Sequence, residues 1–269
     1  MDYTEDLEFA LQLADIADAI SLERFYSLDL HVETKPDKTP VTDADRSVEA
    51  ALKEELKKQR PNDSLIGEEY GTSGENLHGK GSRTWIIDPI DGTANYMRGV
   101  PVWATLIALA VDGKPVVGVV SAPAMGRRWW AAPGTGAHTK HIDGRTAPIQ
   151  VSKISDLEHA SLSYNSLKLW DEMNMLDELM QLTRKVWRTR AYGDFWAYML
   201  LAEGSLEITS EHNLAIYDIA ALVPIVEQAG GQITDLRGEL SATSSSVLAT
   251  NKYLHSTVSE ILNHPNIRN

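Results

Sequence analysis

The sequence predicts a mixed α/β protein made of two lobes, an α+β lobe over residues 1–150 and an α/β lobe over residues 151–269. Two observations predict this division. Apolar residues follow helical spacing near the N-terminus and change to turn-linked strands after Trp85. Beyond residue 150, strand-like and helix-like segments alternate, which is typical of an α/β arrangement.

The first lobe is predicted to start with two helices. Apolar residues between Leu7 and Ile20 lie at helical spacing, and a second amphipathic segment starts at Thr42 or Asp43. Residues 63–71 read as a short buried strand that ends in two glutamates. The remaining strands of this lobe are expected at 85–88, 103–111, 116–123, 127–132 and 146–152.

The second lobe is predicted to alternate strands and helices. Its strands are expected at 160–164, 186–190, 206–210, 232–236 and 245–250. Its helices are expected at 171–185, 193–203, 216–229 and 252–262, and Gly204 and Gly230 act as stop signals.

Composition excludes several classes of function. The chain has no cysteine, so disulfides and thiolate metal sites are impossible. Its net charge is −13, from 38 acidic and 25 basic residues, which disfavours nucleic acid and anionic membranes as partners. The longest apolar run, 102–111, is too short to span a bilayer, and the acidic N-terminus does not resemble an export signal. We therefore expect a cytoplasmic protein.

Acidic residues end several of the apolar elements. Glu68 and Glu69 close one strand, Asp88 and Asp91 follow "WII", Asp45 lies in "TDAD", and Asp218 opens the helix at 216–229. If the fold brings them together, their charges repel unless a cation is bound, and Mg²⁺ prefers such oxygen ligands. The alternative is ordinary: "DPIDG" is also a common turn sequence, and paired glutamates are usually solvated.

The Gly92-Thr93 pair comes directly after the two aspartates. A loop that passes straight into a helix start leaves backbone N–H groups unpaired, and such groups bind anions such as phosphate. A metal beside a phosphate site is the arrangement needed to hydrolyse a phosphate ester. The stretch "KPDK" at 35–38 reads as a solvated loop, with a flap over the metals as the alternative.

Three motifs resemble the inositol monophosphatase family of Mg²⁺-dependent phosphatases. They are "GEE" at 67–69, "WIIDPIDGTANYMR" at 85–98 and "YDIAALVPIVEQAGG" at 217–231, and they occur in the family's order over nearly the whole chain. The resemblance implies a layered αβαβα sandwich with the metal site between two lobes. It also implies a homodimer and two or three Mg²⁺ ions.

The resemblance further implies a ligand for each metal position. Glu68, Asp88 and the backbone carbonyl of Ile90 are expected to hold the first ion, beside the attacking water. Asp88, Asp91 and Asp218 are expected to hold the second, beside the leaving oxygen.

The same resemblance assigns the catalytic and phosphate-binding groups. Thr93, backed by Asp45, is expected to help Glu68 position and deprotonate the water, while the N–H groups of Gly92 and Thr93 hold the phosphate. Three departures from the family pattern, Ala94, Tyr217 and Leu222, remove no ligand and are expected to affect only the substrate cleft.

The resemblance also implies that two further acids contact the alcohol part of the substrate. They are Asp194 and Glu211, and Arg190 is expected to brace Asp194 or Asp218, with a role in holding the lobes together as an equal alternative. An acid pair favours a cationic alcohol, because a desolvated carboxylate is costly without a positive partner. The alternatives are a helix N-cap role for Asp194 and a surface position for Glu211.

The substrate prediction is L-histidinol phosphate, a small phosphorylated amino alcohol. The segments 99–132 and 190–204 resemble the histidinol-phosphate phosphatases of this superfamily. An inositol-1-phosphate or broader sugar-phosphate phosphatase is the alternative within the enzyme class. A dimeric regulatory partner of the transcription machinery is the alternative outside it.

Overall fold

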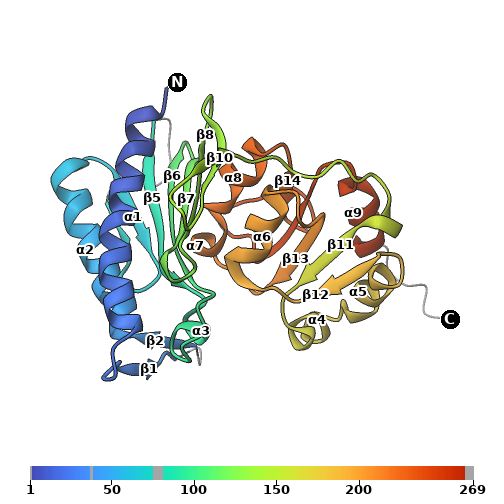
Figure 1. Ribbon diagram of the computed structural model, residues 1–269, viewed down its shortest axis with the longest axis horizontal. Coiled ribbons are helices and arrows are strands. Elements are labelled where there is room, and N and C mark those ends of the chain that lie inside the picture. The colour runs from blue at the N-terminus through green and yellow to red at the C-terminus, as the bar shows by residue number, and fades with distance from the viewer. Residues whose placement is uncertain (1, 37–38, 75–80, 264–269) are drawn as a thin grey trace. The chain divides into compact units, whose positions relative to one another are not determined.

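The computed structural model describes residues 2–36, 39–74 and 81–263, and this part of the chain forms two compact units (Figure 1). The first unit contains the chain up to Pro148 together with Tyr217–Ile225, and the second contains Ile149–Ile216 and the chain from Val226 onward. The structure thus places Tyr217–Ile225 with the first unit, whereas the sequence assigned this segment to the second lobe.

The first unit is built on an eight-stranded sheet with the order β10-β9-β8-β7-β6-β5-β3-β4. Its strands pair antiparallel except for β3 and β5, which run parallel. The bounds are β3 (Ser64–Gly67), β4 (Gly71–Ser73), β5 (Arg83–Asp91), β6 (Ala104–Val111), β7 (Lys114–Ala122), β8 (Arg127–Ala132), β9 (Gly136–Lys140) and β10 (Thr146–Pro148). Sequence reasoning did not predict β9.

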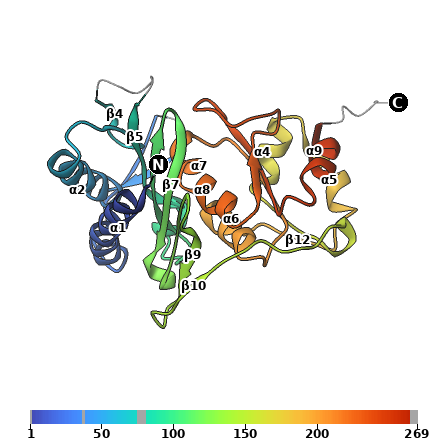
Figure 2. The same cartoon turned by 90° about the horizontal axis from the view of Figure 1, so that it is seen from above.

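Two long helices, α1 (Thr4–Phe25) and α2 (Asp43–Gln59), lie side by side against one face of this sheet (Figures 1 and 2). Their buried faces share a core with β5, β6 and β7, in which Leu13, Leu52 and Trp85 are fully buried. A small ribbon of β1 (Val32–Thr34) and β2 (Pro40–Thr42) leads into α2, and the one-turn helix α3 (Thr93–Tyr96) follows β5. These elements place the ends of β3 and β5 beside the start of α2.

The helix α7 (Ile216–Ile219) lies on the face of the sheet opposite to α1 and α2 (Figure 2). The backbone after α7 comes close to β7 at Gly118. A Cβ at Gly118 would overlap the carbonyl oxygen of Ala221. Only a glycine leaves room for backbone at this point. This packing is the physical reason why Tyr217–Ile225 belongs to the first unit.

The second unit contains a five-stranded mixed sheet with the order β12-β11-β13-β15-β14. The helices α4, α5 and α9 cover one face, and α6 packs on the other against β13 and β15 (Figure 2). The strands are β11 (Ser161–Tyr164), β12 (Arg188–Arg190), β13 (Ile208–His212), β14 (Gln232–Thr234) and β15 (Ser246–Thr250). The helices are α4 (Leu167–Glu172), α5 (Leu176–Thr183), α6 (Asp194–Ala202) and α9 (His255–Asn263).

Two expected helices are interrupted. The segment predicted at 171–185 is split between α4 and α5 at Asn174, which has a left-handed φ of 56°. The segment predicted at 216–229 is split between α7 and α8 (Leu222–Gln228). Pro224 has no N–H to donate to the carbonyl of residue 220, so the helix restarts with Pro224 in its first turn. None of the helices in the described residues is long and apolar enough to cross a bilayer.

Candidate active site

The centre of the candidate site is the end of strand β5. Its pairing with β6 shifts register between Asp88 and Asp91, so the strand bulges where the two aspartates lie. Pro89 has no N–H to donate there, and its carbonyl accepts a hydrogen bond from Thr105 Oγ1 at 2.8 Å. Gly92 follows with φ 83° and ψ 35°, a left-handed conformation that turns the chain directly into α3.

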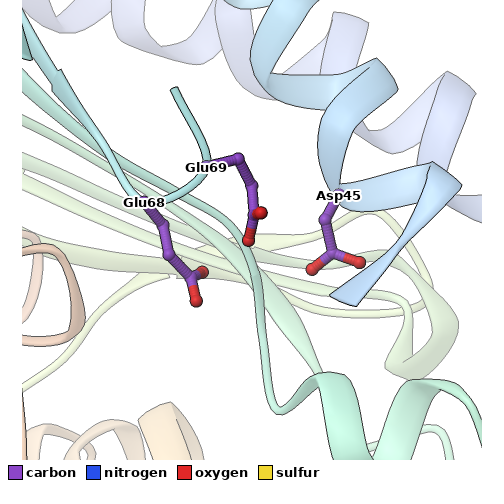
Figure 3. A group of neighbouring side chains, drawn as sticks. All are labelled: Asp45, Glu68 and Glu69. Atoms are coloured by element: carbon purple, nitrogen blue, oxygen red, sulfur yellow. The ribbon is translucent and has the colours of Figure 1, made fainter. Parts of the chain in front are cut away.

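The structure brings together the acidic residues that the sequence singled out, in two groups of three. Asp45 from the first turn of α2 lies with Glu68 and Glu69, which follow β3 (Figure 3). Asp88 and Asp91 of β5 lie with Asp218 of α7. In each group the ligand oxygens lie within 4.8 Å of one another. All six carboxylates belong to the first unit.

Burial and, to a smaller extent, the charges of neighbouring carboxylates favour the protonated form of two of these acids. Burial, followed by the charges of Glu68, Asp91 and Asp218, raises the pKa of Asp88 well above its usual value, and a hydrogen bond between the Asp88 and Glu68 carboxyls adds to this. Burial also raises the pKa of Asp45 to about 6, although hydrogen bonds from Thr42 oppose the shift. Without a bound cation, the Asp88 and Asp45 carboxyls are therefore protonated at higher pH than a free aspartate.

The donor set fits Mg²⁺. The ion is hard, takes oxygen ligands and keeps several waters, so a partly buried group of carboxylates beside a backbone carbonyl suits it. Asp88 is 2% exposed, and its Oδ1 accepts from the backbone N–H of Ile90 at 2.9 Å. This hydrogen bond fixes the carboxylate against the backbone of Ile90, whose carbonyl oxygen is expected to bind the first ion.

Asp45 connects the start of α2 to Thr93. One carboxylate oxygen, Oδ2, accepts from the backbone N–H of Thr42 at 2.8 Å and from its hydroxyl at 2.5 Å, which forms a capping box. The Thr93 hydroxyl lies 3.2 Å from the other oxygen, Oδ1, and 2.9 Å from the carbonyl oxygen of Ile90. The helix cap thus fixes the carboxylate that the Thr93 hydroxyl contacts.

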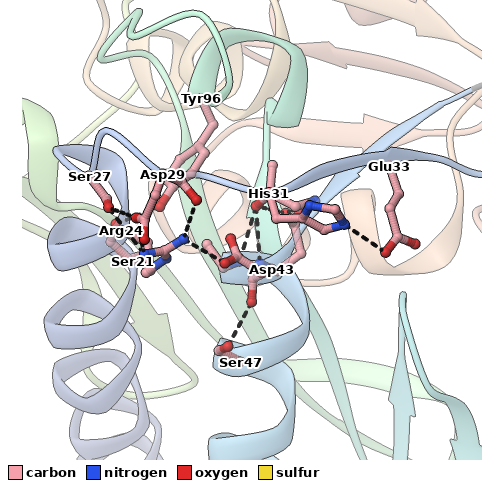
Figure 4. A network of polar contacts seen from close by, with 12 residues as sticks. Ser21, Arg24, Ser27, Asp29, His31, Glu33, Asp43, Ser47 and Tyr96 are labelled. Carbon is pink, nitrogen blue, oxygen red and sulfur yellow. Dashed lines mark hydrogen bonds and ion pairs between the residues drawn. The ribbon is translucent and has the colours of Figure 1, made fainter.

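A polar network holds the start of α2 in place (Figure 4). The Arg24 guanidinium, at the end of α1, donates to Asp29 Oδ1 at 2.9 Å and to Asp43 Oδ2 at 2.5 Å. The backbone N–H of Asp43 donates to the His31 carbonyl at 3.0 Å. These contacts tie the end of α1 and the following loop to the turn that carries Asp45.

Glu49 supports the turn after β3, a role that the sequence did not indicate. Its side chain is fully buried in α2 and accepts from the backbone N–H of Glu69 at 2.7 Å and of Tyr70 at 2.9 Å. The only signal in the sequence was an acidic residue next to Val48 on the apolar side of a helix. Such a residue needs a buried partner, and a sequence does not show what that partner is.

Lys35 is the second residue that the sequence analysis did not place in the site. Its ammonium lies 2.7 Å from Glu68 Oε1 and 2.5 Å from Glu69 Oε1, and its side chain is 18% exposed. Burial alone would lower the pKa of Lys35, but the contacts with the two glutamates outweigh it and raise the pKa. The expectation of a solvated loop therefore does not hold for Lys35, and residues 37–38 lie outside the described part of the chain.

The acid pair expected to contact the substrate lies in the second unit. Asp194 is the first residue of α6, with a left-handed φ of 49°, and burial raises the pKa of its carboxyl. The N-cap is Gly193, so Asp194 is not in the N-cap position proposed as its alternative role. Glu211 of β13 is 2% exposed, which argues against a surface role, and its Oε2 accepts from the Tyr198 hydroxyl at 3.4 Å.

Tyr198 and Asp194 are four residues apart on α6 and therefore share a face of the helix. Tyr198 contacts Glu211 of β13, so the shared face is the one that packs on β13. Asp194 therefore lies on that side of α6. Non-glycine residues with left-handed φ store strain, which is common in binding sites. Arg190 is exposed and donates to the Thr189 carbonyl at 2.7 Å, so the structure gives no support to a brace with Asp194.

A mixed α/β fold with two groups of carboxylates near a strand-to-helix turn is the arrangement expected of a metal-dependent α/β protein. Residues 2–265 match the model of the inositol monophosphatase family. The chain belongs to this family, as the motifs predicted.

Similar sequences and a similar solved structure agree with the assignment to this family. A histidinol-phosphatase of Streptomyces coelicolor is 51% identical over 97% of this chain and 98% of its own length. A histidinol-phosphatase of Mycobacterium tuberculosis is 49% identical over 96% of this chain and 98% of its own. The solved structure of an inositol monophosphatase from Zymomonas mobilis is 32% identical with a TM-score of 0.84, and covers 98% of this chain and 100% of that one. The predicted fold class is therefore confirmed.

Proposed function

We propose that the chain is a Mg²⁺-dependent phosphomonoesterase that hydrolyses L-histidinol phosphate to L-histidinol and phosphate. The proposal of catalysis rests on one observation: six carboxylates lie in two groups around the ends of β3 and β5. The substrate part is supported by the two histidinol-phosphatases that match this chain over nearly their whole length, and by the buried Glu211 and the half-buried Asp194 of the second unit.

Two or three Mg²⁺ ions are part of the proposal. Glu68, Asp88 and the Ile90 carbonyl would hold the first, and Asp88, Asp91 and Asp218 the second. Bound Mg²⁺ supplies a water of lowered pKa and neutralises charge on the phosphate oxygens. Asp88 would take part in both ligand sets, and its burial and the hydrogen bond from the Ile90 N–H hold its carboxylate in place.

The chain itself contributes the groups that orient the reactants. The Thr93 hydroxyl is held between Asp45 and the Ile90 carbonyl, and we expect the attacking water to bind next to it. Glu68 would take the proton of that water. The backbone N–H groups of Gly92 and Thr93 belong to the first turn of α3, where they have no acceptor within the helix. We assign them to the phosphate oxygens.

Asp194 and Glu211 provide the preference for a cationic alcohol. A buried carboxylate loses its hydration and is stabilised by a positive partner, which histidinol offers as an ammonium and an imidazole. Inositol offers only hydroxyl groups. The 32% identity to an inositol monophosphatase nevertheless makes inositol-1-phosphate, or a broader range of sugar phosphates, the second candidate.

A cytoplasmic homodimer with neither nucleic acid nor membrane as a partner completes the proposal. The net charge of −13 disfavours nucleic acid and anionic membranes as partners. The alternative of another class, a dimeric regulatory partner of the transcription machinery, would not need an intact set of ligands.

Removing one metal ligand separates these functions. We expect Asp91→Asn to lower Mg²⁺-dependent phosphate release from histidinol phosphate by at least about a hundredfold, because metal polarisation contributes several kcal/mol to such reactions. Asp171→Asn, at an exposed position of α4, is the matched control and should retain full activity. Equal activity of Asp91→Asn and Asp171→Asn would refute the proposed metal-dependent hydrolysis.

A further inference from the structure

A cavity of about 200 Å³ lies in the second unit, on the side of the sheet away from the acid pair. Its lining combines an imidazole, a carboxylate, a guanidinium, three hydroxyl groups and one side-chain amide. The polar residues that carry the argument are His212, Asp235, Arg237, Thr243, Ser246 and Asn263. All of them belong to the second unit, so the cavity is complete within that unit.

His212 is the most unusual group in this lining. It is 2% exposed, and neither ring nitrogen has a hydrogen-bond partner among the described residues. Its ring packs against Trp170 of α4, with the centroids 4.4 Å apart and an edge-on angle of 78°. Leaving buried polar atoms without partners costs about 1–3 kcal/mol, so a ligand or water is expected to bind them.

The protonation state of His212 defines what it recognises. Burial lowers the pKa of His212, and the Arg237 charge adds to this, while the Asp235 charge opposes it. The imidazole is therefore neutral near pH 7 and offers one donor and one acceptor. It is suited to a polar group on a ligand rather than to a second charge.

Charged groups of both signs face the same cavity. Asp235 accepts from the backbone N–H of Arg237 at 2.9 Å and lies 3.2 Å from the Ser246 hydroxyl, which leaves lone pairs available on both carboxylate oxygens. The Arg237 guanidinium is exposed and makes no ion pair within the described part of the chain. A guanidinium pairs well with a carboxylate, and a carboxylate pairs well with an ammonium.

We propose that this cavity is a second binding site, specific for a small zwitterion of the α-amino-acid type. The ligand carboxylate pairs with Arg237, its ammonium pairs with Asp235, and a polar group on its side chain hydrogen-bonds to His212. The size agrees with a small ligand, because pockets for larger molecules start at about 300 Å³.

The site is distinct from the proposed substrate contacts. Glu211 and His212 are consecutive residues of β13, so their side chains point to opposite faces of the sheet. Glu211 contacts Tyr198 of α6, whereas His212 contacts Trp170 of α4. Ligand binding here therefore needs neither the metal centre nor the acid pair.

The test is a direct binding measurement on the full chain. The twenty standard L-α-amino acids are added singly at millimolar concentration, without Mg²⁺ and with EDTA, and thermal unfolding is followed. At least one should raise Tm by about 2 °C or more, and calorimetric titration should give saturable binding of that amino acid. A wild-type protein that none of the twenty stabilises would overturn the proposal.

Variants then assign the binding to this cavity. Arg237→Gln, at an exposed position, and His212→Phe, which keeps an aromatic ring but removes both nitrogens, should each abolish the shift in Tm. Arg184→Gln, an exposed arginine outside the cavity, and Asp194→Ala should both retain it. A shift that persists in Arg237→Gln, or that is lost in Asp194→Ala, would contradict the assignment.

Discussion

The carboxylate of Glu49 occupies the space that a side chain at Gly67 would need. A Cβ built on Gly67 would overlap Oε1 of Glu49, and Glu49 is fully buried. The same carboxylate accepts the backbone N–H groups of Glu69 and Tyr70. The fit of Glu49 against Gly67 therefore sets the direction in which Glu68 leaves β3.

Replacing Gly67 tests this relationship. We expect Gly67→Ala to push Glu49 away from the two N–H groups, to destabilise the protein by about 1–3 kcal/mol and to weaken its activation by Mg²⁺. Thermal unfolding and a titration of phosphate release against Mg²⁺ measure the two effects. An alanine variant with wild-type values in both measurements would show that the fit of Glu49 under Gly67 has no role in positioning Glu68.

Glu49→Gln addresses the hydrogen bonds alone. Glutamine keeps the size of the side chain but has only one acceptor oxygen for two N–H donors, so one donor loses its partner. We expect a loss of about 1–3 kcal/mol in the free energy of unfolding. Glu54→Gln, at an exposed position of the same helix, is the matched control and should change stability by less than about 0.5 kcal/mol.

Asp45 should act on turnover more than on substrate binding. In Asp45→Asn one oxygen becomes an NH₂ group, which cannot accept from Thr42 or Thr93. We expect kcat to fall about ten- to a hundredfold with little change in KM, since mispositioned groups act mainly in the transition state. Glu54→Gln, at an exposed position of the same helix, should keep kcat within about twofold. Similar losses of kcat in both variants would argue against the Thr93 contact.

Stabilisation by Mg²⁺ should increase with pH. The raised pKa values of Asp88 and Asp45 mean that the folded, metal-free chain keeps protons that the unfolded chain has lost. Its free energy of unfolding therefore falls as pH rises from about 4 through about 6 for Asp45, and the raised pKa of Asp88 acts in the same direction. For Asp45, the shift from 3.8 to about 6 corresponds to about 3 kcal/mol.

Thermal unfolding with EDTA and with Mg²⁺ measures this linkage. Because the ion replaces the retained protons, the rise in Tm caused by Mg²⁺ should grow steadily between about pH 5 and pH 8. Asp88→Asn should reduce the pH dependence of this rise. A rise in Tm that is constant or shrinks over this range would mean that the carboxylates do not bind the ion.

The acid pair should control the choice of alcohol. We expect Asp194→Ala to lower kcat/KM for histidinol phosphate by roughly ten- to a hundredfold, the value of a charge-assisted contact, mainly through KM. The effect on inositol-1-phosphate should be smaller, because a neutral alcohol gains no ion pair from Asp194. Equal losses on both substrates would assign Asp194 a purely structural role at the start of α6.

The sequence predicted the parts of the fold that depend on local patterns. The strand at 85–88 and the helix at 193–203 appear as β5 and α6, because apolar periodicity and turn residues define them within a few positions. Asp88, Asp91 and Asp218 came together as expected, whereas Glu68 lies in a group with Asp45 and Glu69. The placement of Asp218 in the first unit depends on the close approach of backbone to Gly118, which spacing along the chain does not encode.

The supporting contacts could not be predicted in the same way. Glu49 reaches Glu69 across 20 residues and Lys35 reaches Glu68 across 33, and nothing in the local sequence distinguishes these side chains from solvated ones. The orphaned ring of His212 is likewise visible only when the packing around it is known. Long-range partners of buried charges are set by the tertiary structure alone.

The most direct test of the proposed function is a comparison of kcat/KM for L-histidinol phosphate and inositol-1-phosphate, both with saturating Mg²⁺. We predict a preference of at least about a hundredfold for histidinol phosphate, about 2.7 kcal/mol. Comparable values, or a preference for inositol-1-phosphate, would contradict it and would leave only a phosphatase without selection for a cationic alcohol.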